Sequence, residues 1–274
     1  MSGWRAVVHH CPMTQHAAGS PALDHLAELA RVQDLFADAV RRASPDAPVP
    51  GCSPWTVTDL VEHVAGVHRW AAGHVRAGLP DGAPAALRSP ADADPGAGSL
   101  AERYAPAADE LRAVLAAAPP SAVVPTLVGD APSTFWRRRQ LHEVLVHLVD
   151  VEAALAAGDL PGKGHARSLG VGPAVWADAV DEIVHVMAPR QVALGRLDAL
   201  PSVRLVADDV PGPGPDAPHR VWELGSEPDA VEVRGPAREL ALRLWRREGD
   251  DAPTLTVAGE PRAWQAVLAS ALTP

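Results

Sequence analysis

Two polar side chains four residues apart, Glu143 and His147, lie in a segment that is otherwise strongly apolar. The apolar residues of this segment recur at three- and four-residue steps, which predicts a helix; they are Leu141, Leu145, Leu148 and Val149. On a helix, side chains at this spacing rise from one face, one turn apart. A carboxylate and an imidazole presented in this way can hold a divalent metal ion, because both are good ligands for zinc and similar ions.

The same spacing is common in exposed polar pairs on helix surfaces, so the pair alone leaves two interpretations open. The apolar character of the helix favours the metal site, because an ionisable pair that faces a bundle interior needs partners. His63 lies beside the apolar stripe of an upstream helix. It is either a core histidine with a hydrogen-bond partner or the third ligand of the same ion. His68 and His74 fall elsewhere on that helix and are predicted to be surface residues.

Three other groups of residues could do chemistry. Cys52 precedes a predicted helix N-terminus, a position that lowers a thiol pKa, so it is a candidate nucleophile. The alternative is a cysteine packed in a turn. The surrounding prolines predict such a turn, so the cysteine needs no catalytic role. The basic run 137–139 is interpreted as a solvated helix face or a local anion site. His9, His10 and Cys11 could bind metal, but they stand in an unpatterned N-terminal segment.

The composition favours a large core and argues against nucleic acid as a partner. The 274 residues are 47% apolar but only 4% aromatic, so Ala, Leu and Val must fill most of the core. The formal charge is -10 and no basic stripe accompanies it. Two cysteines make no disulfide framework, and the sequence has neither a membrane-span pattern nor a secretion signal. We therefore expect a cytoplasmic protein that is not bound to a membrane.

The hydrophobic periodicity changes near residue 200. Before it, helices are predicted to begin near residues 22, 56 and 99 and to cover 134–158 and 173–190. After it, alternation predicts strands over 203–207, 221–224, 231–233 and 254–257, with helices over 236–247 and 261–272. The predicted class is α+β: a disordered tail over 1–20, a helical bundle over 21–195, and a small α+β domain over 200–274. The long loop over 80–99 is a candidate lid.

Two stretches carry a resemblance to a known family. The first is Cys52, Trp55-Thr56-Val57, Asp59-Leu60-Val61 and His63, followed by Glu143, His147 and Asp150. The second is Trp222, Val233-Arg234-Gly235-Pro236, Leu244-Trp245-Arg246-Arg247 and Val257-Ala258-Gly259-Glu260. Together they resemble the mycothiol-dependent maleylpyruvate isomerase family, whose members join a DinB-like four-helix metal-binding bundle to a sterol-carrier-like C-terminal domain. The resemblance covers nearly the whole chain after the tail.

The resemblance implies His63, Glu143 and His147 as ligands of a divalent ion, normally zinc. The family carries an arginine that can reach the active site within a Leu-Trp-Gly-Arg pattern, which places Arg247 in that role. Arg246 stands where the family has glycine, so both arginines are candidates for the catalytic position. The family's Cys-Pro-Gly-Trp turn becomes Cys52-Ser53-Pro54-Trp55 here, which keeps the turn but changes the residues.

The implied activity is that of a metal-dependent isomerase or S-transferase that uses mycothiol. The thiolate would attack a small electrophile, and an arginine would pair with the substrate carboxylate. The implied partners are this electrophile and the low-molecular-weight thiol, for a monomer or homodimer. The alternatives are a non-catalytic, metal-stabilised protein that binds small molecules or regulators, and a specialised enzyme of actinobacterial secondary metabolism.

Overall fold

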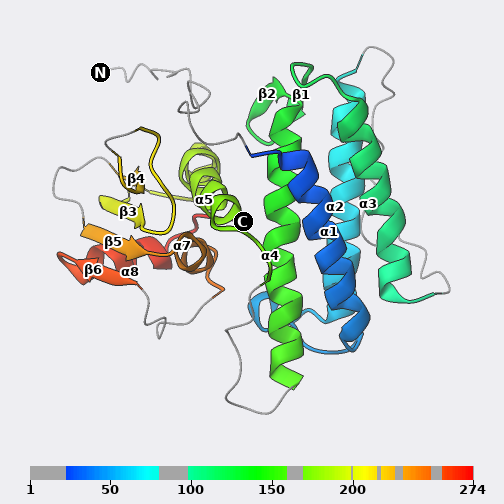
Figure 1. The fold of residues 1–274 in the computed structure, drawn as a ribbon, viewed down its shortest axis with the longest axis horizontal. Coiled ribbons are helices and arrows are strands. Elements are labelled where there is room, and N and C mark those ends of the chain that lie inside the picture. Colours follow the sequence, from blue (N-terminus) through cyan, green and yellow to red (C-terminus); the bar gives the residue numbers. More distant parts are fainter. Residues whose placement is uncertain are drawn as a thin grey trace.

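The computed structural model describes residues 23–79, 98–158, 169–198, 200–214, 217–225, 231–247 and 255–273. The tail predicted over 1–20 and nearly all of the loop predicted over 80–99 lie outside these residues. Within them, a helical N-terminal part stands beside a smaller mixed part, as Figure 1 shows. The predicted α+β class, a helical bundle followed by a small α+β unit, is confirmed.

Four long helices form the bundle: α1 (His25–Arg42), α2 (Val57–Ala77), α3 (Leu100–Ala117) and α4 (Thr134–Gly158). In the bundle α1 packs along α4, and α2 packs along α3 and α4 (Figure 1). Thr56 begins α2 with a capping box: its side chain accepts from the Asp59 N–H, and Asp59 accepts from the Thr56 N–H at 2.8 Å. A short 3-10 turn, η1 (Pro50–Cys52), precedes this cap and contacts α4. A two-stranded hairpin, β1 (Val123–Thr126) and β2 (Gly129–Pro132), joins α3 to α4.

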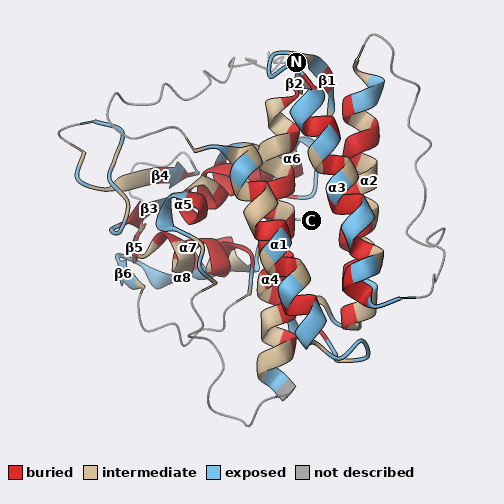
Figure 2. Cartoon of the chain, turned by 45° about the vertical axis from the view of Figure 1, so that its right-hand side comes forward, coloured by how far each residue is buried: buried red, intermediate tan, exposed pale blue. Residues whose placement is uncertain are grey.

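The inward faces of the helices are buried and the outward faces exposed, which Figure 2 shows. One expectation for this bundle is wrong. His68, predicted at the surface, is completely buried. Its Nδ1 donates to Gln140 Oε1 at 2.8 Å, and its Nε2 accepts from the Tyr104 hydroxyl at 3.0 Å and from Gln33 Nε2 at 3.1 Å. A histidine whose two nitrogens find partners is tolerated in a core, which its place on the helix wheel does not reveal.

The C-terminal part begins with α5 (Pro173–Glu182), which continues through a π-helical turn, η3 (Ile183–Met187), into α6 (Ala188–Ala193). The sheet has the order β4-β3-β5-β6, with β3 and β5 parallel and the other neighbours antiparallel. Its strands are β3 (Val203–Ala207), β4 (Arg220–Leu224), β5 (Val231–Gly235) and β6 (Thr256–Ala258). Helix α7 (Ala237–Leu244) packs on α5 and on the sheet, and α8 (Pro261–Ala269) packs on β5.

The end of α7 determines where the following arginines lie. Arg246 adopts φ 58°, the left-handed conformation that usually belongs to glycine. The N–H of Arg246 donates to Arg243 O at 3.0 Å, and the N–H of Arg247 donates to Leu242 O at 2.8 Å. This pair of bonds is a Schellman motif, which ends the helix and reverses the chain. The helix predicted over 236–247 therefore ends earlier, at Leu244.

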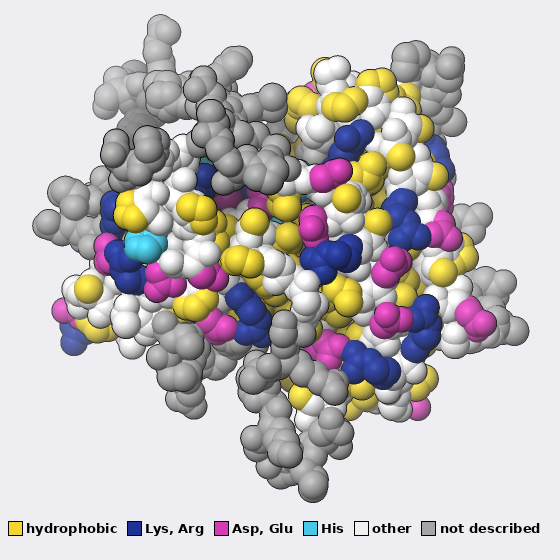
Figure 3. All heavy atoms as spheres, viewed as in Figure 1, with side chains coloured by type: hydrophobic (Ala, Val, Ile, Leu, Met, Phe, Trp, Pro, Cys, Tyr) yellow, Lys and Arg dark blue, Asp and Glu magenta, His cyan; other side chains and the backbone are white. Residues whose placement is uncertain are grey.

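The surface seen in Figure 3 mixes both signs of charge. Basic and acidic side chains lie next to one another over the bundle helices on this face. Ion pairs between the bundle helices include Arg42 with Glu152 and Arg76 with Glu110. None of the described helices combines the length and the apolar character that a membrane crossing requires.

Candidate metal centre

The structure brings the three predicted ligands together where α2 meets α4. His63 Nε2 lies 3.3 Å from Glu143 Oε1, and His147 Nε2 lies 3.4 Å from the same oxygen. One candidate ligand atom from each of the three residues lies within 4.8 Å of the other two. Because Glu143 and His147 are one helical turn apart, α4 presents both of them toward His63. The spacing that suggested the site is therefore matched by the geometry.

The three side chains differ in how far they reach solvent. Glu143 and His147 are 13% and 8% exposed, whereas the His63 side chain is 30% exposed. The ring of Trp55 lies beside the His63 ring, with centroids 4.8 Å apart. His63 is thus the most exposed of the three side chains, and Trp55 covers part of its ring.

Charged neighbours outweigh the effect of burial on the two α4 residues. Burial alone would raise the pKa of Glu143, but Arg139 and the two imidazoles hold this pKa well below its usual value. Burial alone would lower the pKa of His147, but contacts with Asp150, Cys52 and Glu143 raise it well above its usual value. Glu143 is therefore an anion inside the protein, as a metal ligand must be.

Asp150 lies behind His147 and orients its ring. Its Oδ2 lies 2.9 Å from His147 Nδ1, so this nitrogen donates and Nε2 is the ring nitrogen that faces Glu143, where it would bind an ion after losing its proton. A carboxylate on the second nitrogen of a metal-binding histidine is a frequent arrangement, because it fixes the tautomer and the ring position. Asp150 belongs to the stretch that resembles the family, but the sequence alone indicates no role for it. Its i+3 spacing from His147 was the available signal.

Arg247 reaches Asp150 from the C-terminal part. Its Nε donates to Asp150 Oδ1 at 2.6 Å and its Nη2 donates to Oδ2 at 3.1 Å. Arg246 points elsewhere, since its Nη2 donates to the backbone oxygen of Ser270. Of the two candidate arginines, the Schellman turn therefore directs Arg247 to the site and Arg246 away from it.

Gly51 makes room for this pair. A Cβ at this residue would lie 2.6 Å from Asp150 Oδ1 and 3.0 Å from Arg247 Cδ. The turn η1 therefore approaches the ion pair so closely that a side chain would displace it.

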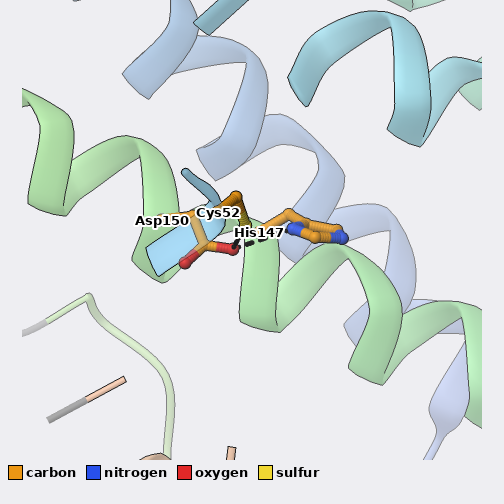
Figure 4. Close-up of side chains that lie close together, drawn as sticks. All are labelled: Cys52, His147 and Asp150. Carbon is orange, nitrogen blue, oxygen red and sulfur yellow. Dashed lines mark hydrogen bonds and ion pairs between the residues drawn. The ribbon is translucent and has the colours of Figure 1, made fainter. Parts of the chain in front are cut away.

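Cys52 belongs to a second group of potential ligands, together with His147 and Asp150 (Figure 4). Its Sγ donates to Asp150 Oδ2 at 3.3 Å and lies 3.5 Å from Arg247 Nη2. The Arg247 guanidinium occupies both oxygens of Asp150 and would repel a cation placed there. Of the two groups, the one formed by His63, Glu143 and His147 is the better metal site.

The basic run at the start of α4 is not a solvated face, so that interpretation is wrong. Arg137 donates to the backbone oxygens of Leu115 and Ala118 at 2.9 and 3.0 Å. The next two arginines have carboxylate partners: Arg138 pairs with Asp178 and Asp181, and Arg139 pairs with Glu143 and Glu182. Sequence reasoning missed the contacts with Asp178, Asp181 and Glu182 because these partners lie 40 to 43 positions away in the chain.

The residues fit a divalent ion by their chemistry and by their charge. Two imidazole nitrogens and one carboxylate oxygen are the donor set of several catalytic zinc sites. Glu143 and Glu182 bring two negative charges to Arg139, so one negative charge remains for a further cation at Glu143, either a protonated His147 or a metal ion. Among the residues that the structure describes, this group has three ligands, so a coordination position remains for a small molecule.

Comparison with known proteins agrees with this architecture. Residues 25–152 match the mycothiol maleylpyruvate isomerase N-terminal domain, and residues 174–266 match the MDMPI C-terminal domain. A crystal structure of the mycothiol-dependent maleylpyruvate isomerase superposes with a TM-score of 0.58 at 14% identity, covering 87% of this chain and 93% of that chain. A histidine-to-alanine mutant of the same enzyme gives the same TM-score and coverage at 13% identity. A search of curated proteins finds no match. At these identities the solved structures establish the fold.

Proposed function

Because the chain belongs to the mycothiol-dependent maleylpyruvate isomerase family, we propose that it is a thiol-dependent isomerase whose metal ligands are His63, Glu143 and His147. The observation that carries the proposal is the convergence of these three donors, of which His63 is partly exposed. We propose zinc as the ion, since imidazole and carboxylate ligands with an open position suit it. When bound, the ion would favour the thiolate form of a coordinated thiol.

We propose a low-molecular-weight thiol, mycothiol, as the co-substrate. Its sulfur would form a bond to one carbon of a cis double bond conjugated to a carbonyl, and the electron pair of that double bond would move onto the carbonyl oxygen. The remaining carbon–carbon single bond would rotate. Return of the electron pair would expel the sulfur and leave the trans double bond. The thiol is regenerated, so this reaction needs no oxidant or reductant.

The residues of the chain would hold the reactants in this reaction. Asp150 would keep His147 in the tautomer that presents Nε2. Arg247 is the arginine that we propose for a substrate carboxylate. Its Nε–Nη2 edge pairs with Asp150, so the substrate would meet the Nη1–Nη2 edge, where Nη1 also donates to Trp245 O at 3.0 Å. A guanidinium suits a planar anion because it offers two parallel N–H groups.

The test uses purified, zinc-loaded protein with mycothiol and maleylpyruvate. We expect cis-to-trans conversion with a thiol concentration far below that of the substrate, because the thiol is returned. Consumption of one thiol per substrate, with a stable thioether as product, would instead identify an S-transferase. Absence of both, with zinc still bound, would favour a metal-stabilised binding protein.

The metal site is tested separately by His147→Ala. We expect elemental analysis to find about one zinc per wild-type chain and a large loss in the variant, since one of three protein ligands is gone. Full retention of zinc in the variant would contradict the site. Thr58→Ala, on the exposed N-terminal turn of α2, is the matched control and should retain the metal.

A further inference from the structure

Arg139 lies between two carboxylates that come from different helices. Its Nη1 donates to Glu182 Oε2 at 2.5 Å, and its Nη2 donates to Glu143 Oε2. The side chains of Arg139 and Glu182 are 11% and 2% exposed. We propose that Arg139 and Glu182 form a positioning pair that holds Glu143 as a one-oxygen metal ligand and maintains its affinity for the ion. This inference rests on the metal site of the proposed function.

The geometry supports the choice of one oxygen. Arg139 occupies Oε2 of Glu143, so Oε1 remains as the atom that faces both histidines, at 3.3 and 3.4 Å from their Nε2 atoms. Rotation of the carboxylate about its last bond would break the contact with a buried guanidinium. Such a contact is costly to lose, since the charge of Arg139 would be left half-paired inside the protein. Arg139 therefore fixes the orientation of the carboxylate before any ion arrives.

The charges explain why a second carboxylate is needed. With Glu143 alone, Arg139 would form a neutral pair and cancel the negative charge that attracts a cation. Glu182 supplies a second negative charge to the same guanidinium. Arg139 therefore does not fully neutralise the charge of Glu143, which can still attract a cation. Burial alone would lower the pKa of Arg139, but the two carboxylates raise it, so the arginine stays charged. Removal of Glu182 would leave Arg139 to compete with the metal for Glu143.

The fold supplies a matched control beside this pair. Asp181 and Glu182 are neighbours at the end of α5, and each pairs with one of two neighbouring arginines of α4. The partner of Asp181 is Arg138, whose other partner is Asp178 and not a metal ligand. Asp181 also accepts from Arg220 and from Trp222 Nε1, both at 3.0 Å, so it joins α5 to β4. Loss of either carboxylate removes an ion pair between α4 and α5, but only the loss of Glu182 acts on Glu143.

The experiment compares Glu182→Gln with Asp181→Asn in the full chain. Zinc affinity is measured by competition with a chromophoric chelator, and thermal stability is measured by circular dichroism on the metal-free proteins. We expect Glu182→Gln to weaken zinc binding by about tenfold or more, the usual effect of losing a partner of a metal ligand. Asp181→Asn should stay within about twofold of wild type, even though its melting temperature falls. Glu182→Asp, which keeps the charge, should recover part of the affinity.

Three results would overturn the inference. Unchanged zinc affinity in Glu182→Gln, with zinc bound to the wild type, would refute the pair and leave the metal site intact. If Asp181→Asn weakens zinc binding as much as Glu182→Gln does, any loosening of the contact between α4 and α5 has the same effect. Absence of zinc binding by the wild type would refute the metal site and this pair together. If Glu182→Gln does not fold, Arg139→Lys replaces it, since an ammonium cannot hold both carboxylates in the same fork geometry.

Discussion

Arg247, which follows α7 in the C-terminal part, pairs through two nitrogens with both oxygens of Asp150 on α4 in the bundle, at 2.6 and 3.1 Å. Asp150 in turn contacts His147 at 2.9 Å. A proposed metal ligand of the bundle, His147, is therefore linked through Asp150 to a residue that belongs to the other part of the chain. The exposed fraction of the Asp150 side chain is 1%, so this contact is made away from bulk solvent, where an ion pair is strong.

Asp150→Asn should weaken zinc binding by about tenfold or more, because the amide keeps the shape of the side chain but loses the charge that supports His147 and holds Arg247. Competition with a chromophoric chelator measures the effect. Glu152→Gln is the control, since Glu152 lies two positions further along α4 and pairs with Arg42 at the surface. Equal zinc affinity for wild type and Asp150→Asn would show that the charge of Asp150 does not support the metal site.

Gly51→Ala should destabilise the protein by about 1–3 kcal/mol, because the new Cβ would meet a buried carboxylate and must displace it. Urea unfolding measures the loss. Gly172→Ala provides the comparison, since nothing lies within 4 Å of the position that its Cβ would take. If both variants unfold at the same urea concentration as the wild type, the close approach of η1 to Asp150 carries no steric cost.

Arg246→Gly should stabilise the folded state by ~1 kcal/mol, because the left-handed backbone at φ 58° disfavours every residue with a Cβ. The lost contact with Ser270 O is exposed and offsets little of this gain. Chemical denaturation measures the difference, and Arg246→Ala separates the two effects because alanine loses the contact but keeps the Cβ. A gain in Arg246→Ala equal to that in Arg246→Gly would mean that the backbone is not strained.

His68 should make the protein less stable in mild acid. Burial, the main cause, lowers its pKa from 6.5 to about 4 in the folded state. As the pH falls below 6.5, the unfolded chain binds a proton at His68, whereas the folded chain does not bind it until about pH 4. The free energy of unfolding therefore falls as the pH drops from 6.5 to about 4. From these two pKa values we expect His68 to contribute about 2 kcal/mol to the loss between pH 7 and pH 5.

Urea unfolding of wild type and His68→Gln at both pH values isolates this contribution. The variant lacks the titrating group, so its stability should fall by about 2 kcal/mol less than that of the wild type over the same interval. An identical fall in the two proteins would mean that His68 is protonated in the folded state near its ordinary pKa.

The sequence was a good guide wherever a local pattern decides the outcome. Apolar periodicity and the Thr56 cap were enough for the bundle helices, and alternation was enough for the strands. The four-residue step between Glu143 and His147 also indicated that the two side chains share one helix face, where they lie 3.4 Å apart. In each case the information lies within a few residues or on one helix face.

The rest depends on contacts between distant segments. His68 can be buried because three other helices supply hydrogen-bond partners for its ring. A helix wheel of α2 alone does not show these partners. The run 137–139 reads as an exposed basic face, and only the approach of α5 shows that two of its arginines meet carboxylates. The choice between Arg246 and Arg247 likewise depended on the Schellman motif at the end of α7. The sequence does not predict this motif, because glycine is the usual residue at the left-handed position that Arg246 occupies.

The π-helical turn η3 follows Glu182 directly and interrupts an otherwise continuous helix. A π turn holds one residue more than an α-turn over about the same rotation around the axis. Deleting a single residue here would therefore leave an ordinary α-turn and keep the downstream segment facing nearly the same way. Arg190, whose Nε donates to Leu127 O of the hairpin at 3.1 Å, would keep this contact. The π turn thus places one more residue between Glu182 and Arg190 than an uninterrupted helix would need to present these two side chains to their separate neighbours.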